Sequence, residues 1–207
     1  MMSTEHWSLL ASRNLAWNEV FARASMFLSA LSFSVVALAL AGQASGFGEE
    51  FRIFALIVLP VVLFLGFTTT LRMDSANHHD AICVIGMNRI RAGYLEMAPD
   101  LERFFVMGVT DDLAGIGKTM GGLPNRPFFV DIFAATPTLV SVLNAVIAAT
   151  IVALGAIQIG LPSGVAIFAG AIVAVVAFTA WSYVVREHAM GLMKSREPAF
   201  PSKESAD

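Results

Sequence analysis

The sequence predicts an all-α, polytopic membrane protein, with four transmembrane helices in two hairpins and a cytoplasmic helical insert between the hairpins. The run 132–185 contains no Asp, Glu, Lys, Arg or His, whereas a soluble fold needs polar groups on its surface. Two further uncharged runs, 24–42 and 53–71, are each close to the length of a helix that crosses a hydrocarbon core. Charged residues make up only 14% of the chain, against about 25% in soluble domains.

The long uncharged run divides into two spans at residues 160–164, which read Gly-Leu-Pro-Ser-Gly. Proline cannot continue the helix that precedes it, and glycine favours a turn. Membrane strands are not expected, because the chain lacks their alternation of apolar and polar residues, and helices satisfy their own backbone groups in lipid. The predicted spans are therefore residues 24–42, 53–71, 138–159 and 164–185.

The basic residues predict how the spans are oriented. Twelve of the thirteen lie before the first span, between the second and third spans, or after the fourth, and only Arg52 lies in a hairpin turn. The positive-inside rule places such segments in the cytoplasm. We therefore expect a multi-pass protein of the plasma (inner) membrane with both termini cytoplasmic. A cleaved signal peptide is not expected, because the first apolar run begins only at Ala24 and is long for a signal sequence.

The segment before the first span, residues 1–23, is predicted to be a cytoplasmic amphipathic helix. Trp7, Leu10, Asn14 and Trp17 recur at helical spacing, and no Pro or Gly interrupts the chain before Gly42. The simplest interpretation is a helix at the membrane surface, with its tryptophans at the level of the headgroups. The alternative is a gating or partner-binding arm.

Residues 72–137 are predicted to form the cytoplasmic helical insert and loop, with six basic and eight acidic residues. The helix of the second span is expected to continue beyond the membrane as far as Ala98, because Pro99 then ends it. An apolar seam on this extension, with spacings of 4, 3, 4 and 3, is typical of helices that pack together. The seam residues, predicted as subunit contacts, are Cys83, Met87, Ile90, Tyr94 and Met97.

After the fourth span, residues 186–207 are expected to form a disordered cytoplasmic tail.

The insert offers few residues for chemistry. Residues 114–119, Ala-Gly-Ile-Gly-Lys-Thr, imitate the end of a phosphate-binding loop, but Asp112 stands where that motif needs glycine. Asp74 and His78 are four residues apart on the expected helix and could share a metal ion, although a solvated helix face is the simpler interpretation. In an oligomer, His78 and His79 could instead form a pH-sensing ring. Cys83 is the only cysteine, so no disulfide framework is expected, and we predict no catalytic or cofactor-binding residue.

Arginines on the helical extension of the second span have several possible uses. Arg89 and Arg91, with Tyr94, could contact anionic lipid headgroups or carboxylates on a neighbouring helix. We expect them instead to form ion pairs with acidic residues nearby in the sequence, namely Glu96, Asp100 or Glu102.

The polar residues inside the predicted spans are uncharged. Ser25, Ser29 and Ser32 form a stripe on one face of the first span, and Asn144 lies near the start of the third. They either hydrogen-bond across a helix interface, at about 1 kcal/mol or less each, or line a pore gated by Phe27, Phe33 or leucines. No span carries an ionisable group, which argues against proton-coupled carriers and intramembrane hydrolases. On the fourth span, Gly170 and Ala174 match the small-xxx-small pattern of close helix packing.

Two stretches of sequence suggest a relationship. Phe54…Pro60…Phe64-x-Gly66, followed by Met87-Asn88-Arg89-Ile90-Arg91-x-x-Tyr94, resembles a group of bacterial four-span membrane proteins without an established activity. The two-hairpin layout with a cytoplasmic insert is also similar to SLATT proteins, small membrane effectors attached to bacterial nucleotide-sensing defence systems. This second likeness is architectural and transfers no site residue.

These observations predict a homo-oligomeric, pore- or channel-like protein or a membrane effector that works in the lipid bilayer. The alternative is a non-conducting scaffold or accessory subunit that binds a cytoplasmic protein through residues 72–131. An enzyme is not expected, because no pair of nucleophile and base and no metal-ligand set is visible. The net charge of −3 gives no sign of nucleic-acid binding, and no cofactor is expected.

Overall fold

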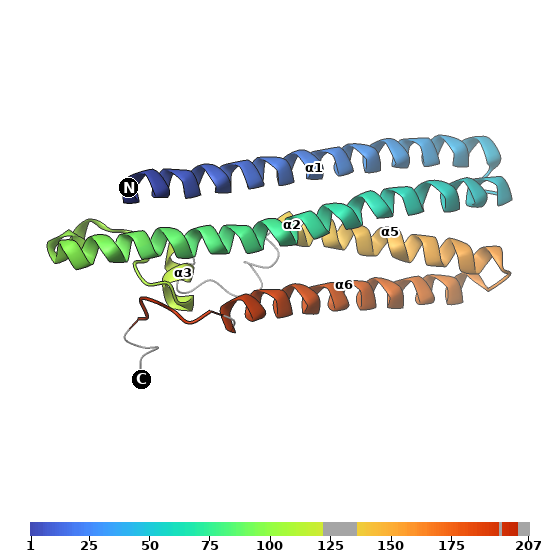
Figure 1. Cartoon of the computed structure of the whole chain (residues 1–207). Helices are drawn as coiled ribbons and strands as arrows, with labels where there is room; N and C mark the ends of the chain where they lie inside the picture. Colours follow the sequence, from blue (N-terminus) through green and yellow to red (C-terminus); the bar gives the residue numbers. More distant parts are fainter. Residues whose placement is uncertain (122–135, 195, 203–207) are drawn as a thin grey trace. The chain divides into compact units, whose positions relative to one another are not determined.

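The computed structural model describes residues 1–121, 136–194 and 196–202, and this part of the chain is all-α without a strand (Figure 1). Four of its helices are long and apolar enough to cross a membrane, which confirms the predicted fold class. In chain order the elements are α1 (Met2–Ser45), α2 (Glu49–Met97), the 3-10 helix η1 (Pro99–Phe104), α3 (Leu113–Thr119), α5 (Thr136–Gln158) and α6 (Ser163–Lys194).

The chain divides into two compact units, and the first two helices and α6 contribute to both. The apolar unit comprises Val20–Asp74 and Ile132–Val185. The polar unit comprises Met1–Glu19, Ser75–Asp131 and Arg186–Asp207. In the printed sequence every uncharged run described above falls in the apolar unit, so the division follows the hydropathy of the chain.

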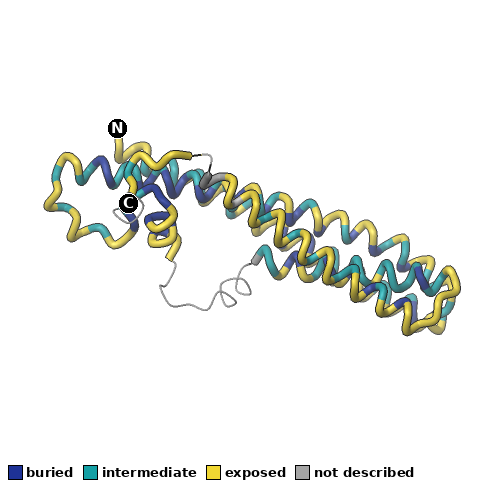
Figure 2. Tube along the Cα trace, turned by 90° about the horizontal axis from the view of Figure 1, so that it is seen from below, coloured by how far each residue is buried: buried dark blue, intermediate teal, exposed yellow. Residues whose placement is uncertain are grey.

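In the apolar unit, α2 and α5 are the more buried helices. Of their most apolar stretches, 33% and 28% of residues are buried, against 11% for both α1 and α6. Figure 2 shows the corresponding long exposed stretches on the helices. Exposed apolar side chains are stable in hydrocarbon, so α1 and α6 present most of the surface that is available to lipid or to other subunits.

Both hairpins turn on residues with a positive φ. Between α1 and α2, Gly46 and Phe47 have φ of 62° and 58°. The Phe47 ring covers Gly42, where a Cβ would lie 2.4 Å from a ring carbon, so Gly42 has no room for a larger side chain. Between α5 and α6, Gly160 has φ of 91°, a conformation that glycine adopts without strain. The predicted Gly-Pro turn is therefore present.

Helix α1 contains both the predicted N-terminal helix and the first predicted span. It is one uninterrupted helix of 44 residues, since neither Pro nor Gly breaks it before Gly42. In the polar unit its first part lies against α2, where Arg13 and the Trp17 indole donate hydrogen bonds to Asp80 at 3.0 and 3.1 Å. Trp17 is therefore hydrogen-bonded to α2, and the position of the tryptophans at lipid headgroups stays a prediction.

Helix α2 continues past the last apolar residue of its span, as predicted. It has 49 residues, tolerates Pro60 inside the helix, and ends at Met97. Ala98 is extended, with φ −149° and ψ 85°, because the residue before a proline is excluded from helical geometry. Within the region expected to be a loop, Leu113–Thr119 forms the short helix α3. The end of the predicted insert, residues 122–135, lies outside the described residues.

The tail was predicted to be disordered, and the described part of it is ordered. Helix α6 continues to Lys194, well beyond the expected end of its span at residue 185. Backbone N–H groups of Ala199, Phe200 and Ser202 then donate hydrogen bonds to the carboxylates of Asp111 and Asp112. Residues 203–207 lie outside the described part of the chain.

Helices α5 and α6 approach each other closely at Gly170. A Cβ at this position would lie 2.6 Å from the Ala149 carbonyl oxygen and 3.3 Å from the Ala153 Cβ, which confirms the close approach predicted for Gly170. Gly170→Leu should separate the helices and lower the free energy of unfolding in detergent micelles by about 1–3 kcal/mol. Gly155→Leu is the control, because a Cβ there meets open space; equal losses in the two variants would contradict the prediction.

Candidate functional site

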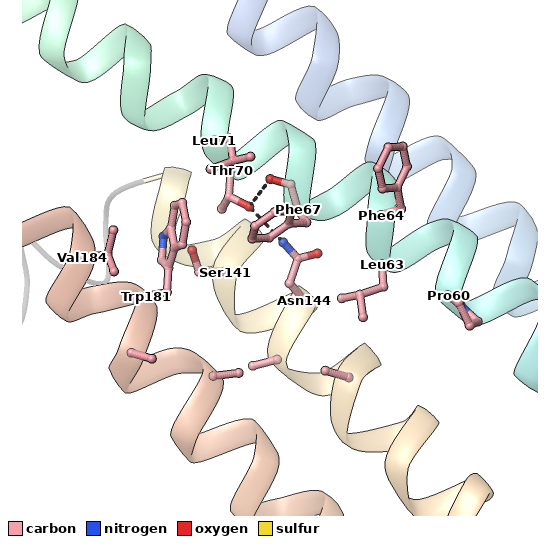
Figure 3. Close-up of a pocket in the computed structure, with 14 residues that line it drawn as sticks. Pro60, Leu63, Phe64, Phe67, Thr70, Leu71, Ser141, Asn144, Trp181 and Val184 are labelled. Carbon is pink, nitrogen blue, oxygen red and sulfur yellow. Dashed lines mark hydrogen bonds between the residues drawn. The ribbon is translucent and has the colours of Figure 1, made fainter. Parts of the chain in front are cut away.

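A groove of about 790 Å³ opens among α2, α5 and α6 in the apolar unit (Figure 3). Its walls are almost entirely apolar and include Phe64 and Phe67 of α2 and Trp181 of α6. The Phe67 and Trp181 rings meet edge to face with centroids 6.2 Å apart. The groove can therefore accept an acyl chain or an apolar side chain from another helix.

Asn144 is the conspicuous polar residue of this groove. Its Nδ2 donates a hydrogen bond of 3.2 Å to the Thr70 hydroxyl, which itself donates to the Gly66 carbonyl at 2.8 Å. The Asn144 Oδ1 is buried and is the only such side-chain N or O atom without a partner among the described residues. Exchanging the amide oxygen and nitrogen would only move the unpartnered atom. A buried polar atom of this kind costs about 1–3 kcal/mol.

Gly66 explains how the amide fits between the helices. A Cβ on this residue would lie 1.8 Å from the Asn144 Oδ1 and 2.7 Å from a ring carbon of Phe27. Only glycine leaves room for both side chains at this point of α2. The sequence motif that contains Gly66 therefore marks a close approach of α1 and α5 to α2.

The serine stripe of α1 lies apart from this groove. Ser25, Ser29 and Ser32 are all exposed and none lines the groove. The hydroxyls of Ser25 and Ser32 donate to their own helix, to the carbonyls of Phe21 and Leu28 at 2.8 Å. Within the described part of one chain, the stripe therefore makes no hydrogen bond to another helix. The structure brings Asn144 together with Thr70, and not with these serines.

A second polar cluster lies where α2 begins and α5 ends. Arg52 Nε donates to the Gln158 Oε1 at 2.9 Å, and Gln158 Nε2 donates to Glu49 at 3.3 Å. These contacts tie the end of α5 to the start of α2. Gln158 was not among the predicted site residues, although it is a polar residue at the end of an apolar run.

In the polar unit, Asn88 is the centre of a buried network. Asn88 is fully buried, and its Nδ2 donates to the Thr110 carbonyl at 2.8 Å. Its Oδ1 accepts hydrogen bonds from the Thr119 hydroxyl and from Arg91, both at 2.7 Å. One side chain on α2 therefore fixes both the loop before α3 and the end of α3.

Arg89 and Arg91 do not form the expected ion pairs. Arg89 pairs with Asp111 at 2.7 Å, and Arg91 donates to Asn88 and to the Gly108 carbonyl. The prediction of Glu96, Asp100 or Glu102 as partners was wrong, because the loop after η1 folds back onto α2. The partner of Arg89 thus lies well beyond all three of these acids in the sequence.

Asp111 and Asp112 are buried carboxylates that remain charged. Burial raises the pKa of Asp111, but N–H groups of Ala199 and Phe200 and the Arg89 guanidinium outweigh it and hold the pKa below its usual value. Burial likewise raises the pKa of Asp112, whereas hydrogen bonds from Ser202, Gly115 and Thr110 lower it further than burial raises it. Both carboxylates are therefore stabilised in their ionised form by the tail and by the loop.

The apolar seam predicted as a subunit contact is partly used inside the chain. Cys83 and Met87 are each 2% exposed, so these two cannot form a subunit surface, and that part of the prediction is corrected. Burial, followed by the Asp80 charge, raises the pKa of the Cys83 thiol, which keeps it protonated and unreactive. Ile90 and Tyr94 are half-buried, and Met97 is exposed.

The remaining candidates show no site. His78 is exposed and Asp74 is half-buried, and no group of three or more His, Cys, Asp or Glu residues suited to a metal occurs in the described ranges. The neighbouring His79 bonds to Ser12 at 2.8 Å. The loop that imitates a phosphate-binding motif is the helix α3, whose N-cap is Asp112.

Four apolar helices and a polar unit define the class of this chain as a polytopic membrane protein. No family model, no curated protein and no solved structure matches it.

Asn88 should be a main determinant of stability in the polar unit. Asn88→Ala would leave the Thr110 carbonyl without its donor and the Thr119 hydroxyl without its acceptor, at a cost of about 3 kcal/mol in the free energy of unfolding. Denaturant unfolding in detergent micelles measures this loss. Asn77→Ala, at a half-buried position on the same helix, is the control and should cost less than about 1 kcal/mol; similar losses for both variants would refute the role of Asn88.

Acid should remove the stabilisation that Asp111 provides. Because its folded pKa is depressed, this stabilisation is fully present above the ordinary carboxyl pKa of about 4 and falls as pH drops through the folded pKa. Asp111→Asn should therefore lower the free energy of unfolding by about 2–3 kcal/mol at neutral pH, and this difference should shrink below about pH 4. A difference that does not change with pH would contradict the prediction. Asp100→Asn, at an exposed position, controls for loss of one negative charge.

Proposed function

We propose that this chain is the subunit of a homo-oligomeric membrane protein of the pore or channel-like type, or a membrane effector that acts through such a pore. The observation that carries the proposal is the serine stripe of α1. Its three hydroxyls lie on one face of an apolar helix, all are exposed, and none bonds to another helix in the described part of the chain. This face of α1 can therefore contact a second copy of the chain without breaking a hydrogen bond between helices.

Copies arranged around an axis with α1 inward would give the stripe a role. Ser25, Ser29 and Ser32 would then line an aqueous path whose wall is otherwise apolar. Phe33 is 76% exposed and follows Ser29 by one helical turn, so it supplies the hydrophobic constriction. Phe27 is only 1% exposed and cannot serve as the gate.

The absence of ionisable residues from the predicted spans supports passive conduction. Proton-coupled carriers and pumps depend on intramembrane Asp, Glu, His, Lys or Arg, and the uncharged runs of this sequence contain none. The excess of basic residues on one side of the spans supports a plasma-membrane protein whose termini and polar unit are cytoplasmic.

A non-conducting scaffold or accessory subunit is the second candidate, supported by apolar side chains on the polar unit. Between the end of η1 and the start of α3, Phe104, Val106 and Leu113 are 65%, 87% and 63% exposed. Exposed apolar side chains of this size on a polar unit are typical of protein-binding surfaces. In this case the polar unit would bind a cytoplasmic protein.

Single-channel recording on the reconstituted full-length protein tests the pore. Replacing Ser25, Ser29 and Ser32 together by leucine should reduce the conductance by about tenfold or more, because an apolar lining expels water. The matched control replaces Thr150, Thr179 and Ser182 by leucine, since these hydroxyls are also exposed and bond to their own helix.

The control variant should conduct like the unmodified protein. No current through the bilayer at any voltage, combined with a monomeric mass, would contradict the pore proposal and favour the scaffold. Equal conductance in both triple variants would show that α1 does not line the path.

A further inference from the structure

The C-terminal segment is attached to the polar unit by its backbone. The N–H groups of Ala199 and Phe200 donate to the two carboxylate oxygens of Asp111 at 2.9 and 2.8 Å. The N–H of Ser202 donates to Asp112 at 2.8 Å, and the Phe200 carbonyl accepts from the Asp111 N–H at 3.2 Å. Backbone groups of residues 199–202 are therefore the main connection to the Asp111–Asp112 pair.

The side chains of the segment contribute little to this attachment. Ala199 and Pro201 are exposed, and Phe200 and Ser202 are only half-buried. Segments that bury few apolar contacts open locally at a small fraction of the free energy of global unfolding. The carboxylates are by contrast buried, with Asp111 6% and Asp112 8% exposed. The receiving carboxylates are thus more buried than the segment that they hold.

Release would not leave Asp111 without a partner. The Arg89 guanidinium lies 2.7 Å from its Oδ2 and is itself 41% exposed, so water can replace the tail on that side. Only residues 195–198 separate the end of α6 at Lys194 from Ala199, and this short tether favours return of the segment. Release of the segment would therefore break only its own hydrogen bonds to Asp111 and Asp112.

We propose that residues 199–202 form a releasable latch, which ties the end of α6 to the loop before α3 and opens when its attachment to Asp111 and Asp112 is weakened. Ser202 is the point at which the latch is most easily opened. Both its N–H and its hydroxyl bond to Asp112, so a negative charge added to this side chain would face that carboxylate directly. Like charges at this distance repel strongly away from bulk water.

A pair of substitutions isolates the charge. Ser202→Asp and Ser202→Asn give side chains of the same size, leave every backbone N–H in place, and differ only in the negative charge. Hydrogen exchange of the full-length protein in detergent micelles, followed by mass spectrometry, reports the amides of residues 199, 200 and 202. These amides should exchange slowly in the unmodified protein and in Ser202→Asn. They should exchange about tenfold faster or more in Ser202→Asp.

Asp111→Ala provides the second variant, because it removes the acceptor of two of the amides. The amides of residues 199 and 200 should then exchange rapidly, while those of α2 around Asn88 stay protected if the polar unit remains folded. Should the three tail amides of the unmodified protein exchange as fast as in an unstructured peptide, the latch does not exist. Equal exchange in Ser202→Asp and Ser202→Asn would also overturn the proposal.

Discussion

A helix in hydrocarbon must satisfy its own backbone groups, and the helix that contains the second span, α2, continues for 49 residues, past Pro60, as far as Met97. The consequence is that one helix supplies contacts within both units. In the apolar unit it offers Gly66 and Thr70 to Asn144. In the polar unit it offers Asp80 to α1 and Asn88 to the insert. Both α1 and α5 contact α2 closely at Gly66, whereas α6 also packs closely on α5 at Gly170.

The parts of the fold that the sequence predicts are those with a local cause. Three of these features each depend on a few neighbouring residues. They are the charge-free runs long enough to cross a membrane, the Gly-Pro turn at residues 160–164, and the end of α2 before Pro99. The small-xxx-small pattern at Gly170 is equally local, since it reports only that backbones can approach closely. Such signals need no knowledge of which segments meet.

The polar contacts could not be predicted because they join distant residues. Arg13 and Asp80 are 67 positions apart, and Ala199 and Asp111 are 88 apart. The insert offers several acids to Arg89, and sequence proximity favoured the wrong ones. The seam through Cys83 and Met87 has the same spacing whether its partner is another chain or, as observed, the polar unit itself. The tail has too few apolar residues to predict order, since its attachment depends on buried carboxylates that only the fold assembles.

The two units differ in how they avoid the free-energy cost of burying a charge without a partner. The predicted spans contain no Asp, Glu, His, Lys or Arg, and Asn144 Oδ1 is the one buried side-chain N or O atom without a partner within the described residues. The polar unit instead buries carboxylates and surrounds them with donors. Asp80 holds the first part of α1, and Asp111 holds the segment after α6. Because each carboxylate is nearly inaccessible to water, losing its donors would cost more than losing an exposed ion pair.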